Sequence, residues 1–243
     1  MIRIPCWRRC MMNSGEVKQV AHDLGADLCG IASIDRFEEA PEGFHPRDVL
    51  PSCQSVVVFA RRFSAATLHC MTKVPYTITR NVLSRDLDTL AVRFCDAMEE
   101  RGILAVPTGT IGPNSRDERT GRWRNVVSSK HSAVAAGLGR IGRNTLLVTP
   151  EYGNMVWIHA VLMDAVLQAD PVLEGSPCPP GCTLCIDRCP AHALGNMEMD
   201  QRACQAYAFH TEPGEAFVFK CHACRTLCPN CFGSKNRHLR PKE

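Results

Sequence analysis

The chain has 243 residues, of which 45% are apolar, and this proportion is enough to build a core and excludes a disordered chain. Its 28 Lys and Arg against 25 Asp and Glu leave a net charge of +3, which argues against a protein that binds duplex nucleic acid through a basic surface. No apolar run is long enough to cross a membrane and the N-terminus lacks the apolar stretch of an export signal, so we expect a cytoplasmic protein.

Cysteine is the informative residue type in this sequence. Fifteen cysteines in a chain expected to stay in a reducing compartment point to metal or redox chemistry rather than to disulfides. Nine of them fall between residues 178 and 231, and six are scattered over the rest. We therefore expect a first domain over residues 1–170 and a cysteine-rich second domain over residues 171–243. With few long apolar stretches, the second must fold around whatever its cysteines bind.

The first domain has the hydrophobic periodicity of mixed helices and strands. In chain order we expect a helix over 14–24, strands over 27–32 and 55–60, a helix over 82–101, a strand over 103–106, a short helix over 132–136, and strands over 145–149 and 155–163. The loop over 107–124 is longer than most connections in compact domains and is either a substrate loop or a solvated excursion. An α/β first domain followed by a cysteine-rich module gives the chain an α+β fold class.

Two cysteine motifs of the ferredoxin type lie in the second domain. The first, C-x3-C-x2-C-x3-C-P, runs from Cys178 to Cys189, and the second ends in C-x2-C-x3-C-P at Cys228. In two-cluster ferredoxins the cysteine before the proline reaches the other 4Fe-4S cluster. This crossed ligation predicts two clusters, named here cluster A and cluster B. The expected ligands are Cys178, Cys182, Cys185 and Cys228 for cluster A, and Cys189, Cys204, Cys221 and Cys224 for cluster B.

Other assignments explain fewer of the cysteines. A tetrahedral zinc site would have acceptable spacing at Cys221, Cys224, Cys228 and Cys231, but it leaves five clustered cysteines without a role. Cys231 is the ninth cysteine of the region and is expected to be a free thiol. The upstream cysteines lack ligand spacing, apart from the isolated pair Cys6 and Cys10, and are expected to be buried or incidental thiols.

A glycine-rich run follows the short helix at 132–136. Its glycines allow the backbone to approach a bulky ligand, and its cations can neutralise phosphate or carboxylate. The residues expected to bind a cofactor here are Lys130, Gly137, Gly139, Arg140, Gly142 and Arg143. The letters G-x-G-x-x-G also occur in dinucleotide-binding folds, but those require a strand where this sequence predicts a helix. The adjoining His131 is a candidate catalytic residue that donates a proton or contacts the cofactor, and the alternative is a hydrogen-bonded structural role.

These residues resemble a known family. The run 131–147, the segments 149–153 and 43–51, and both cysteine motifs look like epoxyqueuosine reductases and the related corrinoid-dependent reductive dehalogenases, over roughly residues 15–231. The resemblance implies a nitroreductase-like domain that cradles cobalamin and a ferredoxin-like module that feeds electrons to the cobalt. It also implies an upstream donor such as a flavodoxin or ferredoxin. By the same analogy Tyr152 is a candidate proton donor, and the alternative is that it packs in the core or a loop.

Two features of the family are missing from this sequence. Epoxyqueuosine reductases carry an acidic residue shortly before the glycine run, whereas residues 125–131 here contain no carboxylate. The helical-repeat tail that helps those enzymes engage tRNA has no counterpart after Cys231. We therefore expect an iron-sulfur oxidoreductase that relays low-potential electrons through two 4Fe-4S clusters to a corrinoid or small substrate. The alternatives are an electron carrier or activating reductase for a partner such as a corrinoid protein, and a redox-sensing regulatory module.

Overall fold

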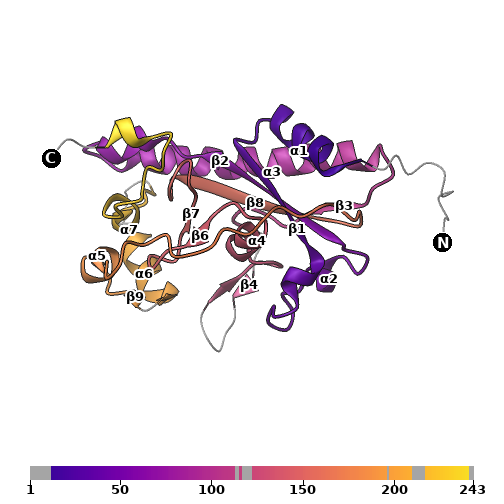
Figure 1. Ribbon diagram of the computed structural model, residues 1–243. Helices are drawn as coiled ribbons and strands as arrows, with labels where there is room; N and C mark the ends of the chain where they lie inside the picture. Colours follow the sequence, from indigo (N-terminus) through magenta and orange to yellow (C-terminus); the bar gives the residue numbers. More distant parts are fainter. Residues whose placement is uncertain (1–11, 113–114, 117–121, 196, 210–216, 241–243) are drawn as a thin grey trace.

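The computed structural model of the chain describes residues 12–112, 115–116, 122–195, 197–209 and 217–240 (Figure 1). Cys6 and Cys10, noted above for their spacing, lie outside the described residues. Among the helices within these ranges, none combines the length and the apolar character needed to cross a membrane.

A four-stranded antiparallel sheet forms the centre of the molecule. Its strands are β1 (Leu28–Ser33), β2 (Ser55–Arg62), β8 (Val156–Met163) and β3 (Ala105–Pro107), in that spatial order. The register of the two central strands pairs Phe59 with His159. The first six residues of β2 are all buried, so the sheet is covered on both faces and its central strand reads as a continuous apolar run.

Two helices cover one face of the sheet, α1 (Ser14–Asp23) and α3 (Val74–Glu99) (Figure 1). Asn13 begins α1 with a capping box. Its side-chain oxygen accepts a hydrogen bond from the backbone N–H of Glu16, and the Glu16 carboxylate accepts one from the backbone N–H of Asn13. The first core cluster lies between these helices and the sheet, with Val17, Ala21, Ile31, Val57, Phe59, Leu87, Phe94, Met98, Val161 and Met163 among its members.

The other face of the sheet is covered by α4 (Ser129–Ala135), by the hairpin of β6 (Arg140–Ile141) and β7 (Leu147–Val148), and by the 3-10 turn η2 (Ile34–Phe37). The end of α4 lies directly on β1, because a Cβ added to Gly30 would sit 2.2 Å from the Ala136 carbonyl oxygen. Only glycine fits under this helix end, and the close approach fixes where α4 lies.

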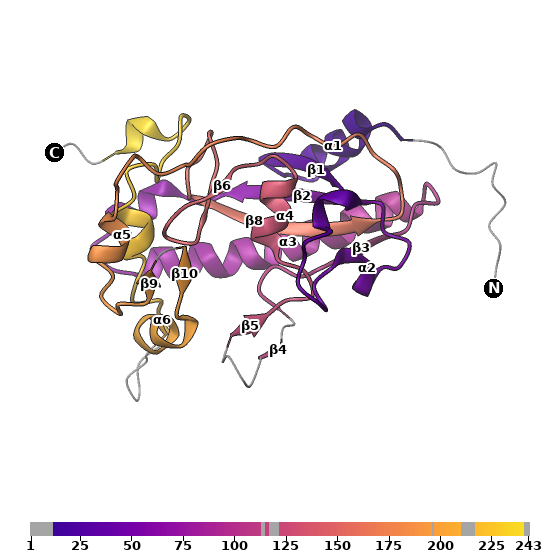
Figure 2. The same cartoon turned by 60° about the horizontal axis from the view of Figure 1, so that its bottom comes forward.

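The cysteine-rich segment gathers at one end of the sheet, beside the N-terminal end of α3 (Figures 1 and 2). Its elements are short: α5 (Leu184–Asp187), β9 (Leu194–Gly195), β10 (Glu198–Met199), α6 (Gln201–Ala208), α7 (Ala223–Thr226) and η4 (Arg237–Leu239). A third core cluster joins it to the rest, with Phe219, Cys231 and Phe232 packed on Phe63, Ala65, Tyr76, Leu83 and Met155. Cys231 is a fully buried part of this cluster.

The mixture of helices and sheet confirms the α+β expectation, with differences in three places. The helix expected from residue 82 begins at Val74, because Pro75 occupies its first turn, where a missing N–H costs nothing. The loop over 107–124 contains a two-stranded hairpin, β4 (Ser115–Arg116) with β5 (Trp123–Arg124). Four other short elements of the first region were not expected, namely η2, α2 (Pro46–Val49), η3 (Ala65–His69) and β6.

Candidate functional site

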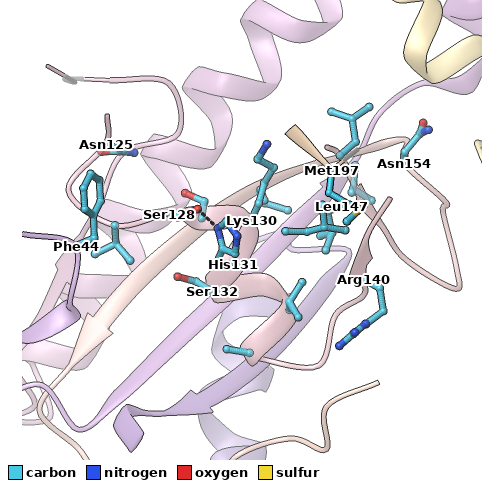
Figure 3. A pocket seen from close by; sticks show the side chains of 18 of the residues that line it. Phe44, Asn125, Ser128, Lys130, His131, Ser132, Arg140, Leu147, Asn154 and Met197 are labelled. Carbon is cyan, nitrogen blue, oxygen red and sulfur yellow. Dashed lines mark hydrogen bonds between the residues drawn. The ribbon is translucent and has the colours of Figure 1, made fainter. Parts of the chain in front are cut away.

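A cavity of about 1760 Å³ opens on the face of the sheet that carries α4. It is lined by η2 and the loop after it, by the end of the 107–124 loop, by α4 and the β6–β7 hairpin, and by residues 172–178 of the cysteine-rich segment. Figure 3 shows Phe44 and Asn125 toward one end and Asn154 and Met197 toward the other, with His131 between them. The volume exceeds the roughly 300–1,000 Å³ of a drug-sized pocket, so the cavity can hold a large ligand.

The lining of the cavity is strongly positive. Its cationic side chains are Arg36, Arg122, Arg124, Lys130, Arg140, Arg143 and Arg225, and among the described residues Glu39 is the only carboxylate that lines it. The net charge of +3 conceals this concentration, so overall composition was too coarse a guide to the partners of this surface. Such a lining favours a ligand that carries phosphate or carboxylate groups.

His131 and Lys130 reach the cavity from the first turn of α4. The Nδ1 atom of His131 lies 2.7 Å from the Ser128 hydroxyl oxygen (Figure 3). Burial, and then the charge of Lys130, lower the pKa of His131 below its usual 6.5, which favours the neutral ring at pH 7. Lys130 donates to the Thr145 carbonyl oxygen over 2.6 Å, and burial lowers the pKa of its ammonium group. His131 therefore lines the cavity as an imidazole beside Ser128 that favours the neutral form.

The three glycines of the predicted cofactor-binding run do not line the cavity. A Cβ on Gly137 would meet the Pro171 carbonyl oxygen at 2.3 Å, and one on Gly139 would meet the Val148 carbonyl oxygen at 2.4 Å. A Cβ on Gly142 would lie 2.8 Å from Asn144 Oδ1. Their small size lets protein backbone pack closely, so the interpretation that they admit a ligand needs correction.

Of the other residues predicted for this region, some line the cavity and one does not. Arg140 and Arg143 line the cavity, where Arg140 also donates to the Gly175 carbonyl oxygen over 3.1 Å. Tyr152 does not line it: its ring is buried in the core cluster under α4, with the Lys235 ammonium 5.3 Å from the ring centre. The proposed proton donor is thus a packed residue, which is the alternative that the sequence left open.

The four predicted ligands of cluster A are electrostatic neighbours. Burial raises the pKa of the Cys228 thiol, and the thiolates of Cys178, Cys185 and Cys182 raise it further. Burial and the thiolates of Cys178 and Cys182 raise the pKa of Cys185 in the same way. Cys178 also lines the cavity, and its sulfur accepts the backbone N–H of Arg143 over 3.3 Å. Three cysteines from one motif and one from more than forty residues downstream thus influence one another electrostatically, and one of them, Cys178, lies at the cavity.

The four predicted ligands of cluster B form a second such group. Burial raises the pKa of Cys224 to about 11, and the thiolates of Cys221, Cys204 and Cys189 act in the same direction. The backbone N–H of Ala193 donates to the Cys189 sulfur over 3.3 Å. Asn144, from the run after α4, donates to the Cys224 carbonyl oxygen over 3.0 Å and so ties this group to the first region.

The remaining cysteines are set apart from both groups. Cys231 lies in the third core cluster, and burial raises the pKa of its thiol to about 12. Cys53 and Cys95 are buried, and Cys29 and Cys70 are half-buried. None of the thirteen described cysteines forms a disulfide. Across the described part of the chain, no three His, Cys, Asp or Glu side chains are grouped closely enough to hold a single metal ion.

Two polar side chains in the cavity wall were not expected from the sequence. Asn154 is 1% exposed, and neither its amide nitrogen nor its amide oxygen has a hydrogen-bond partner. The buried hydroxyl of Ser132 on α4 lacks a partner as well. A third buried group, His159 Nε2, also lacks one, but His159 stacks on Phe59 and does not line the cavity. Only the folded chain could reveal these atoms, because an unpaired polar atom has no sequence signal.

Similar proteins of known identity show to which family the chain belongs. No protein-family model matches the chain. The epoxyqueuosine reductase of Gloeobacter violaceus is 31% identical over 236 residues, which cover 87% of this chain and 67% of the relative. The chain belongs to the epoxyqueuosine reductase family. The family member from Leadbetterella byssophila is 27% identical over 255 residues, 89% of this chain and 79% of that protein. The resemblance inferred from the sequence is confirmed.

Solved structures share the fold of this family. An epoxyqueuosine reductase crystallised with a tRNA-Tyr epoxyqueuosine-modified tRNA stem loop matches with a TM-score of 0.64 and 21% identity, over 94% of this chain and 68% of that one. A reductive dehalogenase, whose structure was described as suggesting a mechanism for B12-dependent dehalogenation, matches with a TM-score of 0.64 and 17% identity, over 92% of this chain and 32% of that one. At these identities the likeness concerns the fold.

Proposed function

We propose that this member of the epoxyqueuosine reductase family is an iron-sulfur reductase in which two 4Fe-4S clusters relay single electrons to a ligand in the cavity. The observation that carries the proposal is the position of Cys178, which belongs to the group of cluster A and also lines the cavity. An electron that reaches cluster A is then at the wall of the site that would use it.

The donor sets fit 4Fe-4S clusters better than zinc. A tetrahedral zinc site with Zn–S bonds of about 2.3 Å needs its sulfurs within roughly 4 Å of one another. No such close group occurs among the described residues, whereas the eight thiols fall into two sets of four whose charges influence one another. Backbone N–H groups from Arg143 and Ala193 point at Cys178 and Cys189, and hydrogen bonds to sulfur are one of the means that tune cluster potentials.

We also propose the two-domain division, with a nitroreductase-like domain over 1–170 and a ferredoxin-like module over 171–243. Asp170 supports a boundary here, because its carboxylate accepts from the Ile31 amide over 2.9 Å and pairs with Lys18. This anchors the last residue of the first domain to β1 and α1. Beyond it the described residues form only short elements, as expected for a module folded around metal.

The cavity is suited to a corrinoid. Its volume accommodates a ligand far larger than a drug-sized molecule, and Lys130, Arg140 and Arg143 can meet the phosphate or carboxylate groups of such a ligand. A corrinoid would supply a cobalt centre that exchanges single electrons and reacts with the substrate. The chain itself would bind and orient the ligand and keep water from the cluster A side of the cavity.

His131 is our candidate for proton transfer. A reduction that consumes protons needs a donor near the substrate, and the family's acidic residue before the glycine run is absent here. His131 lines the cavity and its Nδ1 atom is held by Ser128, so Nε2 is the ring nitrogen that would exchange a proton with the substrate. Its lowered pKa means that it receives a proton readily only when the substrate complex raises that pKa.

An anionic substrate fits this cavity. One neighbour in fold was crystallised with a tRNA stem loop, and the cations at the cavity, Arg122, Arg124 and Arg140 among them, could meet phosphates of such a ligand. Nucleic acid is therefore a candidate substrate despite the small net charge. An electron carrier without its own substrate would have no use for an open cavity of this size, so we favour the enzyme. A flavodoxin or ferredoxin remains our proposed electron donor.

Anaerobic purification tests the proposal directly. We expect a brown protein with about eight iron and eight sulfide per chain. Addition of cob(II)alamin should then shift the cobalt EPR signal, and reduction of the clusters should reduce bound cobalt. One zinc and no sulfide would overturn the relay. A full iron content with an unchanged cobalt signal at micromolar protein would instead retain the relay and overturn the corrinoid.

A further inference from the structure

The most demanding unexplained feature of the cavity is Asn154. It is 1% exposed and lines the cavity, yet both polar atoms of its side chain lack partners. Buried amides in native proteins are nearly always hydrogen-bonded, because an unpaired donor or acceptor away from water is costly. An amide with both atoms unpaired in a cavity wall indicates a group that arrives from the cavity and pairs with both.

The backbone of Asn154 is fixed by the cysteine-rich segment. Its N–H donates to the Cys231 carbonyl oxygen over 3.1 Å, and its carbonyl oxygen accepts from the guanidinium of Arg225. The preceding Gly153 has a φ of +60°, and a Cβ there would lie 2.2 Å from the carbonyl oxygens of Asn230 and Cys231. The main chain at Asn154 therefore has little freedom, which fixes the point in the cavity wall from which its side chain extends.

We propose that Asn154, with Arg225 beside it, forms a subsite for a carboxamide group on the edge of the ligand that occupies the cavity. A carboxamide offers both N–H donors and a carbonyl acceptor and so can satisfy both unpaired atoms of Asn154 at once. A carboxylate offers only acceptors and would leave Asn154 Oδ1 unpaired. The inference rests on the proposed corrinoid function, because the corrin ring of cobalamin carries carboxamide side chains around its edge.

Arg225 gives the subsite its second contact. It is 6% exposed, lines the cavity, and has its guanidinium 5.4 Å from the ring centre of Trp157 and 5.7 Å from that of Phe63. These rings and its bond to the Asn154 carbonyl oxygen hold the guanidinium in place. Its remaining N–H groups can donate to the oxygen of the same carboxamide. The subsite lies at the end of the cavity nearest the cysteine-rich segment (Figure 3).

A ligand-side comparison tests the subsite without any mutation. Cob(II)alamin is compared with its monocarboxylic acid derivatives, in each of which one ring carboxamide is hydrolysed, by anaerobic equilibrium titration followed by EPR. We expect one derivative to bind the holoprotein about tenfold or more weakly than cob(II)alamin, since a hydrogen bond is lost and an acceptor is left unpaired. The others should bind with near-normal affinity.

The variant Asn154→Leu, combined with these ligand derivatives, completes a double-mutant cycle. It removes both unpaired atoms at similar volume, so it should raise the unfolding midpoint of the ligand-free holoprotein while weakening cob(II)alamin about tenfold or more. The derivative that binds weakly to the parent should lose no further affinity in Asn154→Leu, because the two changes remove the same contact. Asn154→Ser, which cannot reach the ligand, should show the same coupling.

Asn125 provides the matched control. It lines the same cavity, but its amide nitrogen donates to the Gly109 carbonyl oxygen and its amide oxygen accepts from the Val126 N–H. Asn125→Leu should therefore lower the unfolding midpoint and show no coupling to any ring carboxamide. If cob(II)alamin and all its acid derivatives bind the parent and Asn154→Leu alike, the subsite is overturned and the corrinoid function stands. If cob(II)alamin does not bind the parent, the corrinoid function fails and the subsite fails with it.

Discussion

The two regions of the molecule differ in what holds them together. Residues 12–170 place a four-stranded sheet between helical layers, with a core cluster on each face. In residues 171–240 the described helices and strands are short, and the buried apolar side chains are Cys185, Ala193, Leu194, Ala208, Phe219, Cys231 and Phe232. Three of these belong to the third core cluster, where they pack on the first region. Burial of apolar surface accounts for the stability of the first region, but it leaves the stability of the second region largely unexplained.

The grouped cysteines of the second region indicate what could stabilise it in place of an apolar core. Eight thiols of the second region lie in two groups, and within each group the negative charge of one thiolate raises the pKa of its neighbours. Grouped thiolates repel one another unless a cation lies among them. Bound iron-sulfur clusters, as proposed above, would convert this repulsion into attraction, and the fold of the second region and its chemistry would then depend on the same eight residues.

Removal of iron should give the largest effect. We expect chelation of the reduced protein to unfold residues 171–240 while the sheet region keeps its structure, since only the former depends on metal. Limited proteolysis with mass spectrometry should find the new cleavage sites beyond residue 170. A sample reconstituted with iron and sulfide serves as the control and should regain protection. Protection of the cysteine-rich segment without iron would break the comparison.

Cys228→Ala and Cys231→Ala form a matched pair three residues apart. Loss of Cys228 should remove cluster A, leave about four iron per chain, and spare the EPR signal of cluster B. Cys231 is buried in the third core cluster, so its replacement should keep about eight iron and cost on the order of 1 kcal/mol through a small cavity. A loss confined to cluster B in Cys228→Ala would refute the crossed ligation.

Gly153→Ala should destabilise the contact between the two regions. Its φ is +60° and its Cβ would collide with the carbonyl oxygens of Asn230 and Cys231, so strain adds to a clash where the two regions meet. We expect the unfolding free energy of the holoprotein to fall by about 2–5 kcal/mol in urea denaturation. Gly43→Ala is the control: its φ is +78° but nothing lies within 4 Å, so only the strain of about 1–2 kcal/mol applies.

The smallest effect concerns pH and His131. Because burial and Lys130 lower the pKa of His131 in the folded state, the unfolded chain binds the proton first as the pH falls through 6.5. His131 should therefore make the protein less stable from about pH 6.5 down to its lowered folded pKa. His131→Gln should flatten the stability profile in that window, and Lys130→Gln should reduce the slope in part. An unchanged profile in both variants would contradict the shift.

What the sequence determined by itself is what depends on neighbours along the chain. Hydrophobic periodicity predicted α1, β2 and β8, and the helix expected before the glycine run argued against a dinucleotide fold. The spacing of the cysteines predicted two sets of four ligands, which stays a prediction until iron is measured. These features are local, or carry a motif with its own chemistry, and so they need no knowledge of the tertiary structure.

The tertiary structure alone decided which side chains meet in the cavity. Arg36, His131, Asn154 and Arg225 converge there from distant parts of the chain, and nothing in their sequence positions links them. The same convergence buried Tyr152 under α4 and pressed the three glycines of the run against protein atoms, so two expected roles changed. The physical reason is that a cavity is a product of long-range packing: its lining is set by how α4 and the cysteine-rich segment approach the sheet, whereas sequence patterns record only the local part of that approach.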